Sequence, residues 1–262
     1  MIDTSIPVVI LAGGLGTRLR EETEYRPKPM VKIGQQPILW HIMKTYAHYG
    51  FKDFIVCLGY RGEVIREYFL DYSVFTGDIQ FDLARGTSRT LSKSPEQVDW
   101  RVTLADTGQP TMTGGRIRRI REYVKSDRFM VTYGDGVANI DIPGLLETHT
   151  RAGRLATLTG VRPTSRFGEL TIEGDRVARF AEKEFLQEVW ISGGFFVFEK
   201  KIFDYLKDDA TVLEQEPLRR LSAEGQLTVF KHDGFWQCMD TYREFEMLNR
   251  LWESPNPPWK VW

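Results

Sequence analysis

The order of the apolar segments in this sequence predicts an α/β fold. Through the first half, apolar runs of strand length alternate with segments whose apolar residues recur at helical spacing, a pattern typical of parallel strands joined by crossover helices. Residues 168–181 then hold two strand-like runs around a hairpin turn, which adds antiparallel strands to the parallel core. Together these observations predict a Rossmann-like, three-layer arrangement whose central sheet is mixed but mainly parallel.

Each predicted element of the first half follows from its local pattern. Residues 7–11 include Val8, Val9 and Ile10, which makes the segment apolar on both faces, as a central parallel strand should be. Apolar residues recur every three or four positions over 39–46, which predicts a helix that Gly50 ends. Further strands are predicted at 54–58, 102–105 and 129–133.

The pattern changes in two later segments. Residues 75–100 are rich in glycine and serine and lose periodicity, which predicts that part of this segment is a mobile loop, either a surface excursion or an oligomer arm or lid. Near the end, Thr241 and Glu244 form the T-x-x-E pattern of a capping box, which predicts the start of a final helix.

Composition excludes several classes of protein. The 262 residues carry 35 Lys and Arg against 36 Asp and Glu, a net charge of −1, so no general positive field would attract nucleic acid. No apolar stretch approaches the roughly 20 residues of a membrane helix, and the first residues lack the regions of a secretion signal. Cys57 and Cys238 are not spaced for zinc or redox chemistry, which favours a reducing, cytoplasmic location.

A glycine cluster follows the first predicted strand. It runs from Gly13 to Leu19, where the carboxyl end of a central strand should open into the ligand crevice of the sheet. It matches neither G-x-G-x-x-G nor a P-loop, which weakens a dinucleotide interpretation. Arg18 in this cluster, and Lys28 held between Pro27 and Pro29, supply cations that suit a triphosphate, although a glycine turn without a ligand stays an alternative.

Two carboxylates also stand at the ends of predicted elements. Asp135 follows the strand at 129–133, and Asp240 precedes the final helix. Together they could hold Mg²⁺ by oxygen, with phosphates and water completing the octahedron. The alternatives are a turn aspartate at 135 and a helix-capping residue at 240.

Weaker candidates lie around further glycines. Thr111 and Arg116 flank a turn at a helix start, where small donors and a guanidinium could hold a base edge or a phosphate. In the second half, Lys183 could neutralise a sugar phosphate and Glu182 could accept from a hydroxyl group. Gly168 and Gly193 could leave room for a sugar ring.

Taken together, these motifs resemble those of the sugar-1-phosphate nucleotidyltransferases. The resemblance rests on three motifs in this order: Leu11-Ala12-Gly13-Gly14-Leu15-Gly16-Thr17-Arg18-Leu19, Pro27-Lys28-Pro29-Met30 and Gly134-Asp135-Gly136. It extends over nearly the whole chain, and it is strongest toward the members that act on glucose 1-phosphate with CTP, through segments that include Met112-Thr113-Gly114-Gly115-Arg116, Gly193-Gly194-Phe195-Phe196-Val197 and Met239-Asp240-Thr241.

The resemblance implies one domain over 1–262, with a nucleotide-binding half at 1–140 and a sugar-binding half with the final helix at 141–262. The implied substrates are CTP and glucose 1-phosphate, joined by in-line attack to give CDP-glucose and pyrophosphate for CDP-deoxysugars of a surface polysaccharide such as O-antigen. The enzyme would be a Mg²⁺-dependent, cytoplasmic homo-oligomer. In the implied site, residues Leu11 to Arg18 surround the nucleotide, Lys28 lies at the reacting phosphates, Thr111 and Arg116 contact the nucleotide, Gly134 lies at the ribose or sugar, Lys183 binds the sugar phosphate, and Asp135 and Asp240 bind Mg²⁺.

Three departures from the family pattern concern the sugar side. Glu184 and Cys238 stand where proline is usual, and Ser192 stands where asparagine is usual. With these differences, the pocket could accept another hexose 1-phosphate. The alternatives are a related enzyme that uses another nucleotide or hexose phosphate, a non-catalytic paralogue that binds sugar nucleotide, and an NAD-dependent reductase.

Overall fold

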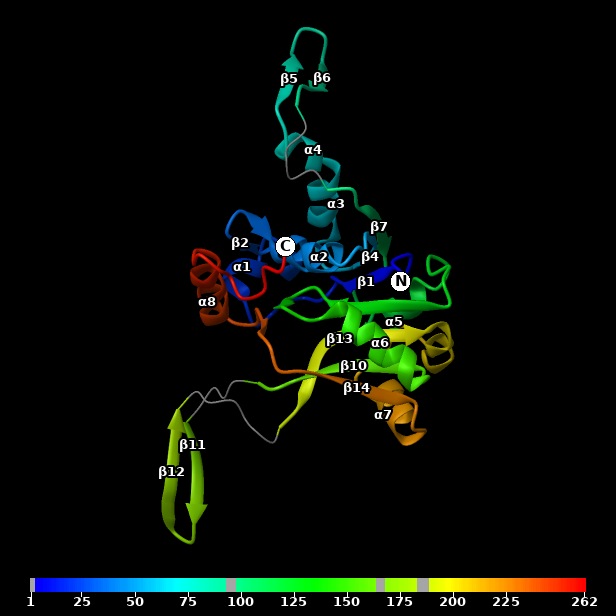
Figure 1. Cartoon of the computed structure of the whole chain (residues 1–262). Helices are drawn as coiled ribbons and strands as arrows, with labels where there is room; N and C mark the ends of the chain where they lie inside the picture. Colours follow the sequence, from blue (N-terminus) through cyan, green and yellow to red (C-terminus); the bar gives the residue numbers. More distant parts are fainter. Residues whose placement is uncertain (1–2, 93–97, 164–167, 183–188) are drawn as a thin grey trace.

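The centre of the molecule is a seven-stranded sheet in the order β14-β10-β13-β8-β1-β4-β7 (Figure 1). The computed structural model describes residues 3–92, 98–163, 168–182 and 189–262. The strands of the sheet are β1 (Val8–Leu11), β4 (Asp53–Leu58), β7 (Arg101–Asp106), β8 (Arg128–Tyr133), β10 (Ala156–Val161), β13 (Ile191–Glu199) and β14 (Leu227–His232). All four strands expected in the first half are present.

The pairing makes the sheet mixed but mainly parallel, as the sequence predicts. β1 lies between β4 and β8 and is parallel to both, and β4 is parallel to β7. β13 is antiparallel to β8 and to β10, while β14 is parallel to β10. One continuous sheet therefore includes strands from both halves of the chain.

Helices cover both faces of the sheet and give the three layers. Val8 and Ile10 of β1 belong to one apolar core, whereas Val9 and Leu11, which point to the other face, belong to a second core. The first core includes residues of α2, α6 and α8, and the second includes residues of α5 and α7. The helices are α2 (Ile38–His48), α3 (Gly62–Leu70), α5 (Thr113–Arg119), α6 (Ile142–Ala152), α7 (Glu216–Ala223) and α8 (Tyr242–Trp252), with shorter turns at α1 (Arg20–Thr23), α4 (Tyr72–Phe75), η1 (Lys28–Met30) and η2 (Lys200–Tyr205).

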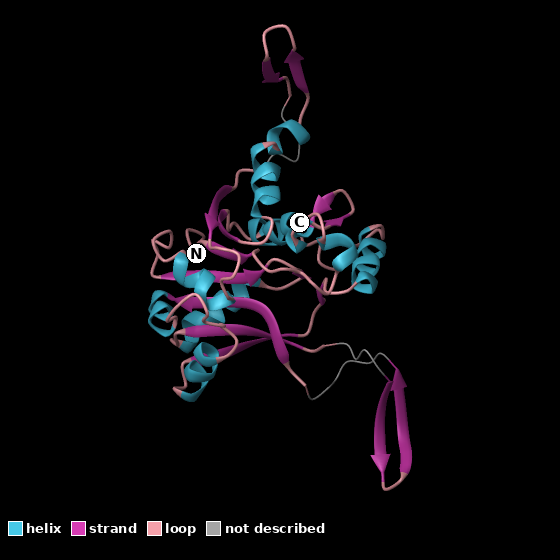
Figure 2. Cartoon of the chain, turned by 180° about the vertical axis from the view of Figure 1, so that it is seen from behind, coloured by secondary structure: helices cyan, strands magenta, loops and turns pink. Residues whose placement is uncertain are grey.

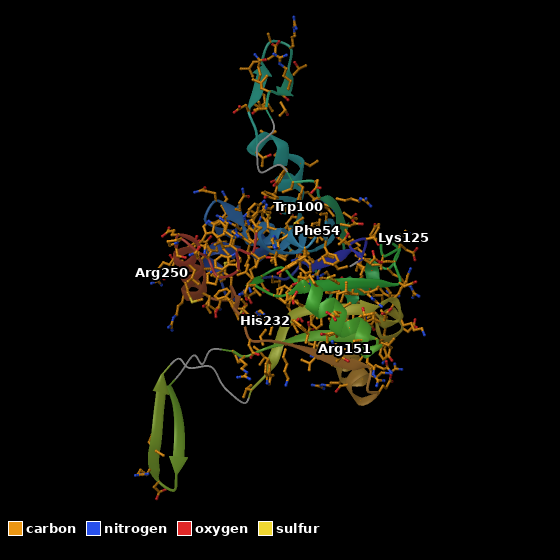
Figure 3. The ribbon with its side chains drawn as sticks, in the orientation of Figure 1. Phe54, Trp100, Lys125, Arg151, His232 and Arg250 are labelled. Carbon is orange, nitrogen blue, oxygen red and sulfur yellow. The ribbon has the colours of Figure 1, made fainter. Side chains whose placement is uncertain are left out.

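The described part of the segment at 75–100 contains two paired strands where a loop was expected. Its described part forms a hairpin of β5 (Ile79–Asp82) and β6 (Thr87–Thr90), which projects beyond α3 and α4 and which we call the arm (Figures 1 and 2). The prediction of a loop missed this hairpin because its strands are short and mostly exposed, so they carry no alternation of apolar and polar residues. At the foot of the arm, Trp100 packs edge-on against Phe54 (Figure 3).

Two predictions for the second half are confirmed. β11 (Gly168–Glu173) and β12 (Arg176–Glu182) form the expected antiparallel hairpin, with Gly174 in its turn at a φ of 63°. The capping box is also present, because the Thr241 side chain accepts from the Glu244 N–H and the Glu244 carboxylate accepts from the Thr241 N–H. Across the described ranges, no helix is both long and apolar enough to span a bilayer.

An aromatic cluster around α2 and the carboxyl-terminal tail buries a histidine. His41 is fully buried beside Trp252 and Trp259. Its Nε2 lies 3.0 Å from the Ile33 carbonyl oxygen, and the Trp259 indole donates to its Nδ1 at 3.4 Å. Both ring nitrogens are thus satisfied by a neutral imidazole, and burial lowers the pKa of His41 from 6.5 to about 4.

This burial predicts an acid-sensitive stability. Between pH 6.5 and about 4 the unfolded chain binds a proton at His41 that the folded chain excludes, so the free energy of unfolding should fall by about 3 kcal/mol as the pH falls through this window. Urea unfolding at several pH values should show that the free energy of unfolding depends less steeply on pH in His41→Gln than in the wild type. The exposed His48 gives the matched control, and a His48→Gln variant that flattens the profile as much would contradict the assignment.

Candidate active site

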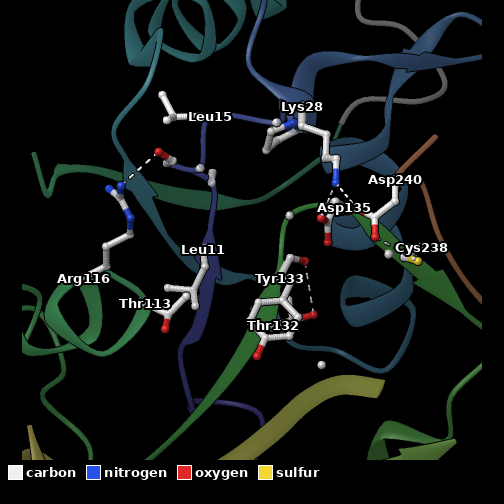
Figure 4. Close-up of a pocket in the computed structure, with 18 of the residues that line it drawn as sticks. Leu11, Leu15, Lys28, Thr113, Arg116, Thr132, Tyr133, Asp135, Cys238 and Asp240 are labelled. Atoms are coloured by element: carbon white, nitrogen blue, oxygen red, sulfur yellow. Dashed lines mark hydrogen bonds and ion pairs between the residues drawn. The ribbon is translucent and has the colours of Figure 1, made fainter. Parts of the chain in front are cut away.

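One pocket gathers most of the predicted site residues. It encloses about 690 Å³ and opens at the carboxyl ends of β1 and β8, with residues of β13 and β15 (Trp236–Cys238) on its other side (Figure 4). It is lined by these residues of the predicted site: Leu11, Ala12, Gly13, Gly14, Leu15, Gly16, Thr17, Arg18, Lys28, Thr111, Arg116, Gly134, Asp135, Gly193 and Asp240. A site at the carboxyl edge of parallel strands is what the topology of an open α/β sheet favours.

The glycine loop after β1 owes its composition partly to close packing. A Cβ at Gly13 would lie 2.2 Å from Nη1 of Arg116, so only glycine fits there. Gly16 has a φ of 63°, a left-handed conformation that glycine adopts without strain. By contrast, a Cβ at Gly14 would meet no atom within 4 Å, so this position is open to the pocket side.

Arg116 fixes the position of this loop through hydrogen bonds. Its guanidinium donates to the carbonyl oxygens of Gly13 and Leu58 at 2.9 and 3.0 Å and to the Thr107 hydroxyl at 2.8 Å. Two further bonds reach the carbonyl oxygens of Gly108 and Gln109. The side chain is buried, and these five acceptors join the glycine loop, the end of β4 and the turn after β7. The family resemblance implies that Arg116 contacts the nucleotide. In this structure its Nη1 and Nη2 groups donate hydrogen bonds to oxygen atoms of the protein.

This arrangement predicts a structural effect of substitution. Arg116→Lys replaces a planar fork by a single ammonium that cannot reach all five acceptors, and the buried carbonyl groups left without partners should lower the free energy of unfolding by at least about 2 kcal/mol. Urea unfolding without nucleotide measures this loss. Arg118→Lys, at an exposed position of the same helix, is the control. Wild-type stability in Arg116→Lys would indicate that the side chain acts only on the ligand.

Lys28 projects into the pocket from a rigid segment. Pro27 precedes the turn η1, and Pro29 packs so closely against Gly134 that a Cβ there would lie 2.8 Å from its ring. The Lys28 ammonium donates to Asp135 Oδ2 at 2.9 Å and to Asp240 Oδ1 (Figure 4). The prolines therefore fix the backbone from which the ammonium reaches both carboxylates.

A two-stranded sheet brings the two carboxylates together across 105 positions of sequence. β9 (Gly136–Ala138) pairs with β15, and Cys238 lies opposite Gly136. Asp135 immediately precedes β9, and Asp240 follows shortly after the end of β15, so the two aspartates lie at the same end of this strand pair. The Met239 N–H donates to the Asp135 carbonyl oxygen at 2.8 Å. Because β15 is short and half-buried, its pattern gives little sign of this pairing in the sequence.

The charges in this group stabilise one another. Burial opposes the charged form of Lys28, but the two carboxylates outweigh it and raise the pKa of the ammonium. Burial also opposes the charged form of Asp240 and would raise the pKa of its carboxyl, yet Lys28 and Arg18 hold that pKa below its usual value. Arg18 Nη1 lies 2.9 Å from Asp240 Oδ2, and its side chain is 68% exposed, so it can leave this pair at small cost.

Two contacts at the pocket edge involve residues that the sequence did not place at the site. The Glu244 carboxylate accepts from the Asp240 N–H at 2.7 Å, so the capping box of α8 also fixes the backbone of Asp240. Glu214 accepts from the hydroxyl groups of both Tyr133 and Thr113, which line the pocket. The capping pattern could have indicated Glu244, but Glu214 lies in a turn with no distinctive pattern.

The structure describes only some of the residues predicted to bind the sugar phosphate. Gly193 lines the pocket, and a Cβ there would lie 2.7 Å from Val161 Cγ1, so the small size of this residue also serves packing against β10. Gly168 and Glu182 lie on the β11–β12 hairpin. Lys183 and Glu184 lie outside the described residues. The roles of Gly168, Glu182, Lys183 and Gly193 at the sugar stay predictions.

Comparison with known proteins shows the family of this chain. The model of the nucleotidyl transferase family matches residues 7–240. The chain belongs to this family. Nucleotidyl transferases of known function include two glucose-1-phosphate cytidylyltransferases that are each 51% identical to it, from Salmonella typhi and Salmonella typhimurium, with 97% of this chain and 98% of theirs covered. The family resemblance stated from the motifs is therefore confirmed.

A solved structure supports the fold. HddC from Yersinia pseudotuberculosis superimposes with a TM-score of 0.70 at 24% sequence identity, over 95% of this chain and 100% of that one. At this identity the likeness concerns the fold alone, and it confirms the mixed, mainly parallel sheet with helices on both faces.

Proposed function

We propose that this nucleotidyl transferase joins CTP to glucose 1-phosphate and releases CDP-glucose and pyrophosphate. The two Salmonella relatives, which are 51% identical over 97% of this chain, are named for this activity. The observation in the structure that carries the proposal is the convergence of Lys28, Arg18, Asp135 and Asp240 beside an open glycine loop. This set handles phosphate charge, which is what the reaction requires.

The chemistry needs alignment more than acid–base catalysis. A phosphate oxygen of the sugar phosphate, already ionised at neutral pH, forms a bond to the α-phosphorus while the bond from that phosphorus to the pyrophosphate oxygen breaks. Lys28 and Arg18 are the cations placed to hold the phosphates and to stabilise charge on the leaving pyrophosphate. Cys238, the thiol in this pocket, is an unsuitable nucleophile because burial and the neighbouring carboxylates raise its pKa to about 12.

The carboxylates fit a magnesium ion. Asp135 and Asp240 both reach a single atom, the Lys28 nitrogen, so their oxygens also converge closely enough to share one cation, and they are the hard ligands that Mg²⁺ prefers. When bound there, Mg²⁺ would neutralise phosphate charge. Asp240 is held for this role by its backbone bond to Glu244, and Asp135 by its position at the start of β9.

Turnover with a panel of nucleotides tests the proposal. Pyrophosphate release with glucose 1-phosphate should give a kcat/KM at least about tenfold higher for CTP than for UTP, dTTP, GTP or ATP. No preference for CTP would leave a related nucleotidyltransferase. A second series with CTP and other hexose 1-phosphates tests the sugar, because Ser192 lines the pocket where the family usually has asparagine. Binding without any turnover would indicate a non-catalytic paralogue, and NAD binding a reductase.

The two halves of the chain are proposed to divide the substrates. Residues 1–140 supply the glycine loop, Lys28 and Arg116, and they would bind the nucleotide. Residues 141–262 supply Ser192, Gly193 and Asp240, and they would bind the sugar phosphate and contribute one metal ligand. Both described cysteines are free thiols, which supports the proposed cytoplasmic location, and the use of CDP-glucose for a surface polysaccharide stays a prediction.

We also propose that the chain forms a homo-oligomer through the arm. A two-stranded hairpin is marginally stable alone, and the arm exposes Phe81, Leu83 and Leu91, with Leu83 90% exposed. A second copy of the chain would cover these side chains and pair the free strand edges. The carboxyl-terminal tail packs within the chain, since Trp259 is fully buried against Phe235 and Trp252.

Light scattering after size-exclusion chromatography tests this assembly. The wild type should have a mass of at least two chains, and the double variant Phe81→Glu, Leu83→Glu should have the mass of a smaller species. Tyr123→Glu, which changes an exposed apolar side chain of the body, should leave the mass unchanged. A monomeric wild type, or an arm variant of unchanged mass, would rule out the arm as the contact.

A further inference from the structure

The Lys28 ammonium lies where a cation shared by the two carboxylates would lie. Its Nζ donates to Asp135 Oδ2 at 2.9 Å and also to Asp240 Oδ1 (Figure 4). The side chains of Lys28 and Asp240 are only 9% and 11% exposed, so water cannot substitute freely for either partner. An atom within hydrogen-bonding distance of both oxygens leaves no space for a second cation between them.

Both aspartates already pair with cations of the protein itself. Two carboxylates face two protein cations, because Arg18 Nη1 lies 2.9 Å from the second oxygen of Asp240. Both Asp240 oxygens are therefore engaged by protein cations. A divalent ion that approached this arrangement would meet a buried ammonium of like charge and an Asp240 carboxylate whose two oxygens are already engaged.

Bound phosphates would change the pairing of these cations with the carboxylates. Lysine carries its charge on a flexible four-carbon stem, so the ammonium can swing while the backbone of the Pro27-Lys28-Pro29 segment stays fixed. Arg18 is largely exposed and equally able to move. A triphosphate on the glycine loop offers both cations several oxygens with more negative charge than the two carboxylates carry, and their departure would free the carboxylate oxygens.

We propose that Lys28 acts as a stand-in for the metal in the free enzyme, and that its transfer from Asp135 and Asp240 to phosphate opens the metal site. Nucleotide and divalent cation then bind with positive coupling, and the cation alone binds weakly. This inference rests on the proposed use of a divalent ion by these carboxylates. In this proposal, Lys28 pairs with the two carboxylates before substrate binds and with phosphate afterwards.

Manganese binding to the nucleotide-free full chain tests the proposal without turnover. The electron paramagnetic resonance signal of free Mn²⁺ gives its dissociation constant for the wild type, Lys28→Met and Lys28→Arg. Lys28→Met should bind Mn²⁺ at least tenfold more tightly than the wild type, because it removes the competing charge and keeps a similar stem. Lys28→Arg keeps the charge and should show no such gain. The gain should disappear in Lys28→Met combined with Asp240→Asn.

Equal dissociation constants for the wild type and Lys28→Met would overturn the proposal, as would a gain that survives Asp240→Asn. These outcomes are separate from a failure of the proposed function, which would appear as the absence of CDP-glucose formation by the wild type whatever its affinity for manganese.

A measurement on the wild type covers the case in which Lys28→Met does not fold. Crystals exposed to MnCl₂ without nucleotide should show no anomalous peak at Asp135 and Asp240, with Lys28 still paired to both. Crystals that also hold a non-hydrolysable CTP analogue should show the peak, with the ammonium on phosphate. A manganese peak at the two carboxylates in the nucleotide-free crystals would overturn the proposal.

Discussion

Asp240→Asn is expected to lower kcat for CDP-glucose formation about 10³-fold. The substitution keeps the shape of the side chain but removes the charge that pairs with Lys28 and Arg18 and that would bind Mg²⁺. Because asparagine can still offer one oxygen, the Mg²⁺ concentration needed for half-maximal rate should rise as well. Pyrophosphate release measured against Mg²⁺ concentration records both effects.

Two controls separate this effect from general damage. Asp233→Asn changes an exposed carboxylate a few residues away and should leave kcat within about twofold. EDTA should abolish wild-type turnover and added Mg²⁺ should restore it. Undiminished turnover in EDTA would remove the metal role of Asp135 and Asp240 together, and near-normal kcat in Asp240→Asn would reduce Asp240 to a residue beside a helix cap.

Lys28→Met is expected to lower kcat about 10²- to 10³-fold, because it removes a cation that would stabilise charge on the transferring phosphates. It also leaves Asp135 and Asp240 facing each other with Arg18 as their remaining cation, so the metal-free variant should lose stability. Added Mg²⁺ should restore part of that stability, since it can take the position of the ammonium.

The matched control for Lys28 lies in the same segment. Lys32 is exposed on β2 (Lys32–Ile33), and Lys32→Met should leave both kcat and the unfolding temperature unchanged. Steady-state turnover and thermal unfolding with and without Mg²⁺ test the pair of variants. Wild-type turnover in Lys28→Met would show that Lys28 is an ordinary loop residue.

Much of the fold could be predicted because its central strands are buried on both faces. Val8, Val9 and Ile10 are continuous in the sequence for that reason, and they are all fully buried in β1. Asp135 and the glycine loop could be placed at one edge because parallel strands end on the same side of a sheet. The arm could not be predicted, since its exposed strands leave no alternating pattern.

The candidate site could be predicted in its residues but less well in its contacts. Charge and glycine content indicate that Arg116 and Lys28 belong near an anion, but they do not show that five protein oxygens already accept from Arg116. Nor could the sequence show that Lys28 lies between two aspartates brought together by β9 and β15. Contacts of this kind depend on long-range pairing, which local periodicity does not encode.

The stereochemistry of transfer tests the central claim most directly. With one diastereomer of CTP that carries sulfur on the α-phosphorus, the wild type should convert glucose 1-phosphate to thio-substituted CDP-glucose with inverted configuration at that phosphorus, because the sugar phosphate displaces pyrophosphate in one in-line step. Phosphorus NMR of the product distinguishes the two configurations. Retained configuration would require a covalent enzyme intermediate, and the absence of any sugar nucleotide would mean that this pocket does not carry out cytidylyl transfer.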